Sequence, residues 1–581
     1  MNTDRRYRRD DGTDRSSVAA GGATRTTARR QASPLSLAGA ALALAVATAA
    51  TVSASEPVHW EASALIRAEG FERSEVMTVL RTLTDEIGSR LTGSPGMQRA
   101  NEWTRDQLAE WGLIDARLEE WGPFGRGWSF DRASVHLLSP HAMPLHALPQ
   151  AWTPGTEGPV RGTVKALRVS SEADLESMRG ELAGKIVLLD EAREPGERDE
   201  AFARYDETEL EEISRIDLDD LAESPGRSAR LASFRKRLEL RRALREFLRQ
   251  EGVVAALEMS DRDNGIVRVT GGGSREPDED PGVPTLVVAA EHYRLLHRLL
   301  DRDLPVEIEV DVRARFHDDQ LMAYNTLADL PGSDLAHQVV VVGGHLDSWH
   351  AAGGSNDNAA GVAVAMEAMR ILRATGLEPR RTIRIGLWSG EEQGLLGARA
   401  HVAQHYAERP QNEDPETRDL PRFLQPPQWP ITYKPAWDDF QAYFNLDNGS
   451  GRIRGIYTQS NPALVPIFSA WLQPLRDLGA DTVSNRDTGG TDHQAFDAYS
   501  LPGFQFIQDD LDYSSRTHHT ELDHADHARA ADLKQAAVVM ATFAYHAAMR
   551  DELLPRKPKP RPDPEAQREA EQSEAETAAR R

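Results

Sequence analysis

The 581-residue sequence contains no cysteine. This absence excludes a disulfide framework and all thiol chemistry, so any metal ion must be bound by histidine and carboxylate side chains. Aromatic residues make up only 6% of the chain, but hydrophobic residues as a class make up 40%, which is enough for a large core. Basic residues are the minority charge, and the formal net charge is −24 at pH 7. We therefore expect neither nucleic acid nor an anionic membrane as a partner.

The N-terminal region has one uncharged apolar run, Leu35–Ala50, which is too short to span a membrane comfortably. An Arg-rich segment precedes this run, and the small residues Val52-Ser53-Ala54 follow it. This order is typical of a signal peptide, so we predict that residues 1–54 direct export to the periplasm or the medium and leave no membrane contact after removal. Arg29-Arg30 leaves a twin-arginine route open beside ordinary secretion, and a retained membrane anchor is the remaining alternative.

The remaining chain changes character along its length. Residues 55–130 form a first segment, in which the pattern of residues 75–113 predicts two helices. Residues 131–318 contain short β-type runs separated by Gly and Pro, which indicates a smaller β-rich or α/β module. Within that module, residues 195–250 are dense in Glu, Asp and Arg with regular Leu, and we predict a charged helical insertion. Residues 319–553 alternate strand and helix patterns, and the tail from residue 554 lacks an apolar period, so we expect it to be disordered.

The alternating region predicts the fold class. Its strand patterns are continuous apolar runs, and its helices separate them, which is typical of an α/β fold with a mostly parallel sheet and helices on both faces. A long surface loop rich in Pro and Trp is expected at residues 409–438. The predicted strands are 339–343, 382–388 and 440–444, and the predicted helices are 359–372 and 394–405.

Acidic and histidine residues follow these strands where each strand ends. In open α/β sheets this carboxyl edge is where ligands bind. Carboxylates gathered there without partners would repel one another at a cost of several kcal/mol each. Two divalent cations would remove that repulsion, and imidazole with carboxylate suits zinc, cobalt or manganese. The residues concerned are His345, Asp347, Asp357, Glu391, Glu392, Asp447, His518 and His519.

These residues stand in motifs that resemble a known family. The motifs are His345-x-Asp347, Asp357-Asn358-x-x-Gly361, Gly390-Glu391-Glu392-x-Gly394-x-x-Gly397, Asn445-Leu446-Asp447 and His519-Thr520-x-x-Asp523. Together they resemble the co-catalytic zinc exopeptidases, which include leucyl-type aminopeptidases and glutamate carboxypeptidases. The stretch Ser89–Ser94, followed by Ala100–Trp103, resembles the plasma glutamate carboxypeptidase (carboxypeptidase Q) subgroup, in which a protease-associated domain interrupts the peptidase domain. The resemblance implies that residues 131–318 form that domain.

The resemblance also implies a role for each residue. Asp357 would bridge two zinc ions, with His345 and Asp447 completing one site and Glu392 and His519 the other. Asp347 would hold the imidazole of His345, and Glu391 would be the catalytic acid and base for a zinc-bridged hydroxide. Because a carboxyl group at its ordinary pKa is a poor proton donor at neutral pH, the site must raise the pKa of Glu391. His518, where many relatives have Tyr, leaves the choice of His ligand open, and His493 is either a substrate residue or part of the loop packing.

The predicted function is hydrolysis of a terminal peptide bond in a dipeptide or short peptide. A carboxypeptidase version needs a cation for the terminal carboxylate, for which Arg486 and Arg516 are candidates, whereas an aminopeptidase version would hold the terminal ammonium. Two other functions remain open, namely a receptor-like protein without activity and a single-zinc glutaminyl cyclase. Retention of His345 beside Asp357, with all other ligands and the base present, argues against both. Members of the family often dimerise, so the resemblance leaves a homodimer open.

Overall fold

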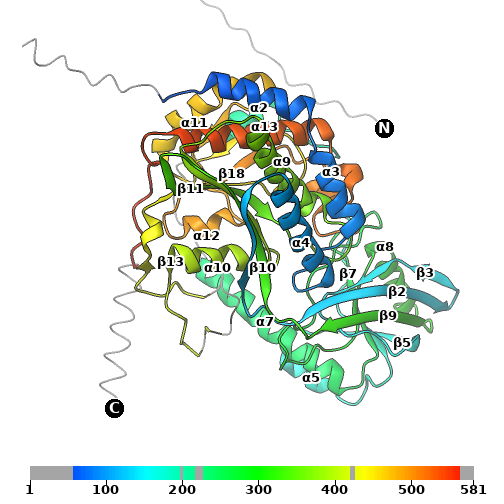
Figure 1. The fold of residues 1–581 in the computed structure, drawn as a ribbon. Coiled ribbons are helices and arrows are strands. Elements are labelled where there is room, and N and C mark those ends of the chain that lie inside the picture. The colour runs from blue at the N-terminus through cyan, green and yellow to red at the C-terminus, as the bar shows by residue number, and fades with distance from the viewer. Residues whose placement is uncertain are drawn as a thin grey trace, which may run out of the picture. The chain divides into compact units, whose positions relative to one another are not determined.

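The computed structural model describes residues 56–562, apart from 197–200, 216–226, 416, 419 and 421–424. The predicted signal peptide lies outside the described residues. From Glu56 onward the chain forms one unit that contains two eight-stranded sheets (Figure 1). Within the described ranges, no helix has both the length and the hydrophobicity needed to cross a membrane.

The first sheet is a mixed sheet with a parallel centre. Its strands lie in the order β1-β10-β12-β11-β15-β18-β16-β17. Strands β12, β11, β15 and β18 pair in parallel, whereas β1 with β10, β10 with β12, and β16 with β18 are antiparallel. The predicted α/β fold is confirmed, although the sheet is parallel mainly in its centre. The bounds are β1 Ile114–Trp121, β10 Ala323–Leu330, β11 Leu335–His345, β12 Arg381–Trp388, β15 Phe440–Asn445, β16 Ile453–Tyr457, β17 Thr482–Ser484 and β18 Gly503–Gln508.

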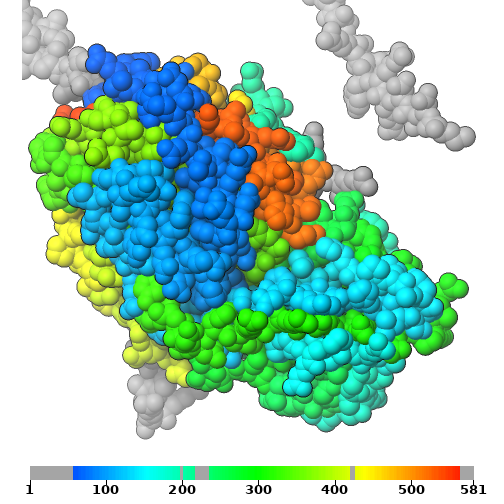
Figure 2. All heavy atoms as spheres, turned by 45° about the vertical axis from the view of Figure 1, so that its right-hand side comes forward, coloured from blue at the N-terminus to red at the C-terminus, as the bar shows by residue number. Residues whose placement is uncertain are grey.

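Both faces of this sheet are buried, and β11 shows why its sequence is continuously apolar. Val340 and Val342 belong to one hydrophobic core, whereas Val341 points into another core on the opposite face. Successive side chains of a strand point to opposite faces, so a strand covered on both sides needs no polar alternation. Helices α2, α3, α9 and α13 pack together on the first face, and α10 and α12 lie on the second (Figure 1). In Figure 2 the blue N-terminal helices lie directly beside orange α13.

The helices mostly begin and end where their sequence predicts. Helix α4 has Ser94 as its N-cap, whose side chain accepts a hydrogen bond from the backbone N–H of Met97, and Pro95 opens its first turn. The break between α3 and α4 includes a π-helical turn, η1, and Gly88 at a φ of 83°. The bounds are α2 Trp60–Glu72, α3 Val76–Arg81, η1 Thr82–Ile87, α4 Pro95–Glu110, α9 Ala360–Ala374, α10 Leu396–His405, α11 Val465–Trp471, α12 His493–Asp497 and α13 Ala530–Met549.

The second sheet is formed by residues from 127 to 317, in the order β3-β2-β9-β5-β6-β7-β8-β4. It has its own hydrophobic core, to which Ile186, Leu257 and Leu286 contribute. Strands β5 to β8 pair in parallel, and the outer pairs are antiparallel. The bounds are β2 Gly127–Ser139, β3 Met143–Leu145, β4 Ala147–Pro149, β5 Val160–Ala166, β6 Ile186–Leu188, β7 Ala255–Met259, β8 Thr285–Val288, β9 Glu307–His317, α5 Glu172–Ser177 and α8 Ala290–Leu300.

The segment predicted as a charged helical insertion contains two helices in its described part. Helix α7, Arg227–Gln250, packs Phe247 and Leu248 against the second sheet. Helix α6, Glu207–Ser214, instead contacts β17 of the first sheet. Just before α6, Arg204 forms ion pairs with Asp509 at 2.8 Å and Asp532 at 2.6 Å. The insertion therefore connects the two sheets.

The prediction of disorder from residue 554 is wrong for residues 554–562. Leu554 is only 2% exposed and belongs to the main core. The guanidinium of Arg556 lies 4.2 Å from the ring centroid of Trp437, and Lys557 forms an ion pair with Asp497 at 2.7 Å. One Leu, one cation–π contact and one ion pair anchor this stretch, and such single contacts give no periodic pattern in the sequence. In the long loop 409–438, strand β14, Thr432–Tyr433, pairs with β13, Ala407–Glu408.

Candidate metal centre

The carboxyl ends of the central parallel strands carry most of the predicted site. His345 is the last residue of β11, and the Glu391-Glu392 pair lies three residues beyond the end of β12. Asp447 follows the end of β15. Asp357 lies in the turn η2, Ser355–Ala359, that leads into α9. Because these strands are neighbours in the sheet, the side chains converge at one edge.

Asp357 lies at the centre of the group, with one oxygen toward each of two histidines. Its Oδ1 lies 3.3 Å from His345 Nε2, and its Oδ2 lies 3.2 Å from His519 Nε2. His345 Nε2 is also 3.1 Å from Asp447 Oδ1, and His519 Nε2 is 3.0 Å from Glu392 Oε2. The structure thus brings all five predicted ligands together in two sets that share Asp357.

The donor set fits divalent cations. Asp357 Oδ2 and Glu392 Oε1 are buried and have no hydrogen-bond partner. Unpartnered buried carboxylate oxygens are strongly unfavourable unless a cation satisfies them. The site supplies three carboxylates and two imidazoles and no sulfur, which is a donor set that zinc accepts.

Hydrogen bonds to Asp523 hold the turn that carries Asp357 in place. The backbone N–H groups of Asn356 and Asp357 donate to the two carboxylate oxygens of Asp523 at 2.7 and 3.1 Å. On the other side, the amide of Asn358 donates to the carbonyl of Leu446 at 2.9 Å. Asp357 therefore has little freedom to turn away from either histidine.

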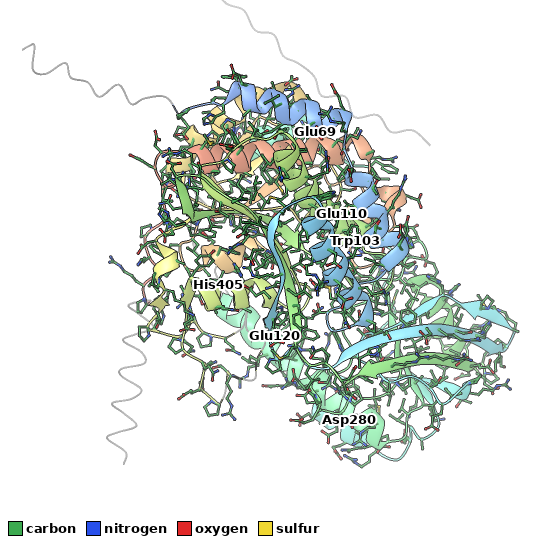
Figure 3. The ribbon with its side chains drawn as sticks, viewed as in Figure 1. Glu69, Trp103, Glu110, Glu120, Asp280 and His405 are labelled. Atoms are coloured by element: carbon green, nitrogen blue, oxygen red, sulfur yellow. The ribbon has the colours of Figure 1, made fainter. Side chains whose placement is uncertain are left out.

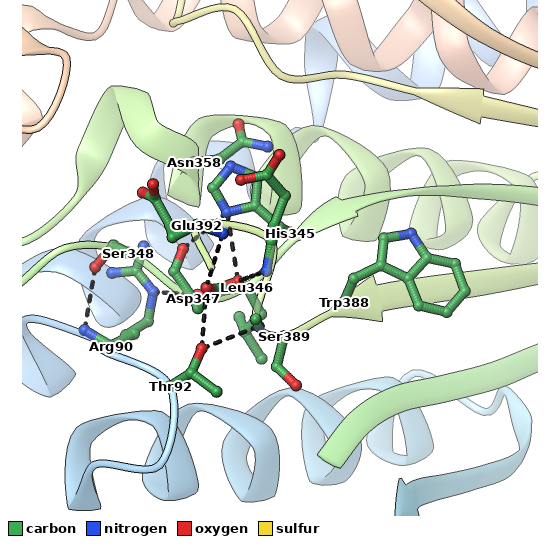
Figure 4. A network of polar contacts seen from close by, with 12 residues as sticks. Arg90, Thr92, His345, Leu346, Asp347, Ser348, Asn358, Trp388, Ser389 and Glu392 are labelled. Atoms are coloured by element: carbon green, nitrogen blue, oxygen red, sulfur yellow. Dashed lines mark hydrogen bonds and ion pairs between the residues drawn. The ribbon is translucent and has the colours of Figure 1, made fainter. Parts of the chain in front are cut away.

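Asp347 holds more than the imidazole that the resemblance assigned to it (Figure 4). His345 Nδ1 donates to the backbone carbonyl of Asp347 at 3.0 Å, whereas the carboxylate lies farther away, at 3.6 Å. The carboxylate instead accepts hydrogen bonds from the backbone N–H groups of Glu391 at 3.2 Å and Glu392 at 3.4 Å. It also accepts the hydroxyl of Thr92 at 3.0 Å. One residue thus orients a histidine with its main chain and the Glu391-Glu392 turn with its side chain.

Arg90 is a positioning residue whose role the sequence did not reveal. Its side chain is fully buried, and it donates to the carbonyl of Leu346 at 2.7 Å (Figure 4). It also donates to the carbonyl of Gly354 at 2.8 Å. Burial lowers the pKa of Arg90 to about 10, although Asp523 and Asp347 oppose this shift, so the guanidinium stays charged at neutral pH. Arg90 therefore ties together both ends of the loop between His345 and Asp357.

The surroundings of Glu391 favour its protonated form more strongly than water favours the protonated form of an ordinary carboxyl group. Burial raises the pKa of Glu391 well above its usual value. The charge of His345 opposes this shift, whereas the negative charges of Asp447 and Asp492 add to it. This direction agrees with the requirement that the residue must both accept and return a proton.

The remaining predicted histidines differ in their access to the site. His518 Nε2 lies 3.9 Å from Asp357 Oδ2, farther than His519, and its ring packs on that of His519 with the centroids 3.8 Å apart. His493 is fully buried, and its Nε2 hydrogen-bonds to the carbonyl of Thr488 at 2.9 Å, which favours loop packing over substrate contact.

Two histidines for which the sequence offered no partner have one. His350 Nε2 hydrogen-bonds to the carbonyl of Pro149 at 2.7 Å, and burial lowers its pKa to about 4. His401 lies 2.7 Å from Glu119, whose number differs by 282. Such pairs join distant segments, so spacing along the chain gives no sign of them.

Comparison with known proteins matches this chain to peptidases. Residues 325–544 match the model of peptidase family M28. Carboxypeptidase Q of Rattus norvegicus is 28% identical over 482 residues, which cover 82% of this chain and 86% of that protein. The human carboxypeptidase Q is 26% identical over the same shares.

Solved structures share the fold. A peptidase M28 precursor from Shewanella amazonensis SB2B has a TM-score of 0.60 and 23% identity, with 86% of this chain and 99% of that chain covered. A zinc aminopeptidase from Bacillus subtilis has a TM-score of 0.50 and 17% identity, with 82% and 95% covered. These likenesses show that this chain shares its fold with those proteins.

Proposed function

Since residues 325–544 form a domain of peptidase family M28, a family of metallopeptidases, we propose that this chain is an exported zinc exopeptidase that cleaves terminal peptide bonds of dipeptides or short peptides. The observation that carries the proposal is the position of Asp357, with one carboxylate oxygen toward His345 and the other toward His519. Five protein ligands in two sets that share Asp357 exceed the four positions of a single tetrahedral zinc ion. Export is supported by the leader-like pattern of residues 1–54.

Two zinc ions would be held by the two donor sets. His345, Asp447 and one oxygen of Asp357 would hold the first ion, and His519, Glu392 and the other oxygen of Asp357 would hold the second. Bound zinc acts as a Lewis acid that polarises the peptide carbonyl and lowers the pKa of water. Glu391 removes a proton from the attacking water and then returns it to the leaving amine. The backbone N–H of Glu391 donates to the carboxylate of Asp347, and this hydrogen bond fixes the backbone position from which the Glu391 side chain extends.

The test uses the secreted form of the chain with a panel of free dipeptides and aminoacyl amides. We expect hydrolysis to disappear after treatment with a chelator and to return when zinc is added. Activity that survives complete removal of metal would overturn the proposal. No activity on any substrate despite bound zinc would favour the receptor-like alternative, and cyclisation of N-terminal glutamine would favour the cyclase.

A carboxypeptidase reaction on dipeptides needs a cation near the zinc ligands, and Arg268 fits that need better than the two predicted arginines. Arg486 donates to the carbonyls of Glu212 and Arg215, and Arg516 pairs with Asp512 at 3.0 Å. Arg268, from the second sheet's module, also forms an ion pair, with Asp261 at 2.8 Å through Nη1, but its Nη2 lies 3.2 Å from His519 Nδ1 and therefore beside a predicted zinc ligand.

We therefore expect Arg268→Met to lower kcat/KM for free dipeptides by about 10- to 100-fold, because one charge-assisted hydrogen bond contributes about 1.5–3 kcal/mol. Aminoacyl amides, which lack the terminal carboxylate, should change much less. Steady-state kinetics on matched dipeptide and amide substrates measure this difference. An equal loss on both substrates would assign Arg268 to the support of His519 instead, and would leave the aminopeptidase alternative in place.

A further inference from the structure

A second group of potential metal ligands lies away from the proposed catalytic centre, between β1 and α10. Glu119 comes from β1, and His401 and His405 come from α10, whose last residue, His405, is labelled in Figure 3. His401 Nδ1 lies 2.7 Å from Glu119 Oε2, and His405 Nε2 lies 2.7 Å from Glu119 Oε1. Residues four apart lie on one face of a helix, so both rings are presented to the same carboxylate.

The charge of this group is not balanced by a nearby basic side chain. Glu119 is only 7% exposed. The guanidinium of Arg384 acts on the group through its charge, but it is already bound to Asp329 by two hydrogen bonds of 2.7 Å. Among the described residues, no Lys or Arg side chain forms an ion pair with Glu119, and a buried carboxylate in that position favours the binding of a cation.

We propose that Glu119, His401 and His405 bind a further divalent metal ion, for which zinc has the best fit. Two imidazoles and one carboxylate make up a known zinc donor set, and a water molecule completes the tetrahedral coordination. The side chain of His405 is 32% exposed, and it borders a cavity of about 90 Å³ that is also lined by Tyr406 and Asp439. The cavity leaves room for a water molecule on the His405 side of the group.

The position of the group indicates what this ion does. Helix α10 begins four residues after Glu392, and β1 ends at Trp121, whose indole N–H donates to the hydroxyl of Ser389 at 3.0 Å. Both elements therefore adjoin the turn that carries the proposed base. An ion that joins Glu119 to α10 would stabilise the support of that turn without contacting the substrate.

The experiment measures zinc per chain after the full-length protein is stripped with a chelator, reloaded with Zn²⁺ and freed of loosely bound metal by gel filtration. We expect His405→Gln and Glu119→Gln to hold one zinc ion fewer than the unmodified chain. His136→Gln, which changes an exposed histidine on β2, is the matched control and should lose none. Dipeptide hydrolysis by His405→Gln should persist, because no ligand of the proposed catalytic centre is changed, and this activity also verifies that the variant folds.

Equal zinc content in the unmodified chain and both variants would overturn the proposal and leave a purely hydrogen-bonded triad. Loading with Co²⁺ gives an independent measurement, because the visible spectrum of a four-coordinate site should be missing from His405→Gln. Asp357→Asn separates this proposal from the proposed function. Asp357→Asn should hold one zinc ion per chain more than the double variant Asp357→Asn/His405→Gln. This difference of one ion should persist even if Asp357→Asn fails to release the catalytic ions.

Discussion

Replacing Glu391 with Gln should lower kcat for dipeptide hydrolysis by about 1,000-fold while the zinc content stays unchanged. The amide has nearly the shape of the carboxyl group but can neither accept the proton of the attacking water nor pass one to the leaving amine. Glu391 contributes no oxygen to the two ligand sets around Asp357, so the metal ions have no reason to leave. KM should change little, because the loss concerns the transition state rather than substrate binding.

The measurement combines steady-state kinetics with metal analysis of the same protein sample. Glu391→Asp is the matched variant, since it keeps a carboxylate but withdraws it from the substrate. We expect its activity to lie between that of the unmodified chain and that of Glu391→Gln. The neighbouring Gln393→Ala leaves both carboxylates intact and should retain activity near that of the unmodified chain. Full activity of Glu391→Gln would rule out Glu391 as the base, and a parallel loss of zinc would make its role one of metal retention.

The sequence was most informative where local pattern and topology agree. Val340–Val342 is apolar in every position because both faces of β11 are buried, and such a strand must lie inside a covered sheet. Once β11, β12 and β15 are placed in parallel, their carboxyl ends must meet, so His345 and Asp447 could be brought together without coordinates. The sequence did not decide which of His518 and His519 is the ligand, because adjacent residues in a turn share the same sequence pattern and differ only in the direction of their side chains.

The sequence was least informative where a side chain acts on distant backbone. Arg90 donates to the backbone carbonyl groups of residues 346 and 354. Every residue has such a carbonyl group, so the sequence does not show which ones accept a hydrogen bond. Asp347 was expected to face His345, but its carboxylate accepts backbone N–H groups of the Glu391-Glu392 turn. The antiparallel pairs of the first sheet, β1 with β10, β10 with β12 and β16 with β18, were not predicted, since pairing direction depends on connections and not on strand composition.

The shared position of Asp357 leads to the last prediction, which concerns the loss of two metal ions from one substitution. Asn presents a single neutral oxygen where Asp presents two that share a charge, so Asp357→Asn removes a ligand from both sets. The like charges of Glu392 and Asp447 remain, but each ion loses both attraction and one bond. In a His405→Gln background, which lacks the separately proposed site, we expect the zinc content to fall from two ions per chain to none, and hydrolysis to disappear with it.

Thermal unfolding provides the second readout. Ligands that bind only the folded state raise its stability in proportion to the logarithm of their concentration over Kd, about 2.7 kcal/mol at a hundredfold excess over Kd. Added zinc should therefore raise the Tm of the His405→Gln protein but leave that of Asp357→Asn/His405→Gln unchanged. His136→Gln, added to the same background, should keep the full response to zinc. If Asp357→Asn/His405→Gln still binds two ions with an undiminished rise in Tm, Asp357 does not bridge them, and the convergence of its two oxygens on His345 and His519 needs another explanation.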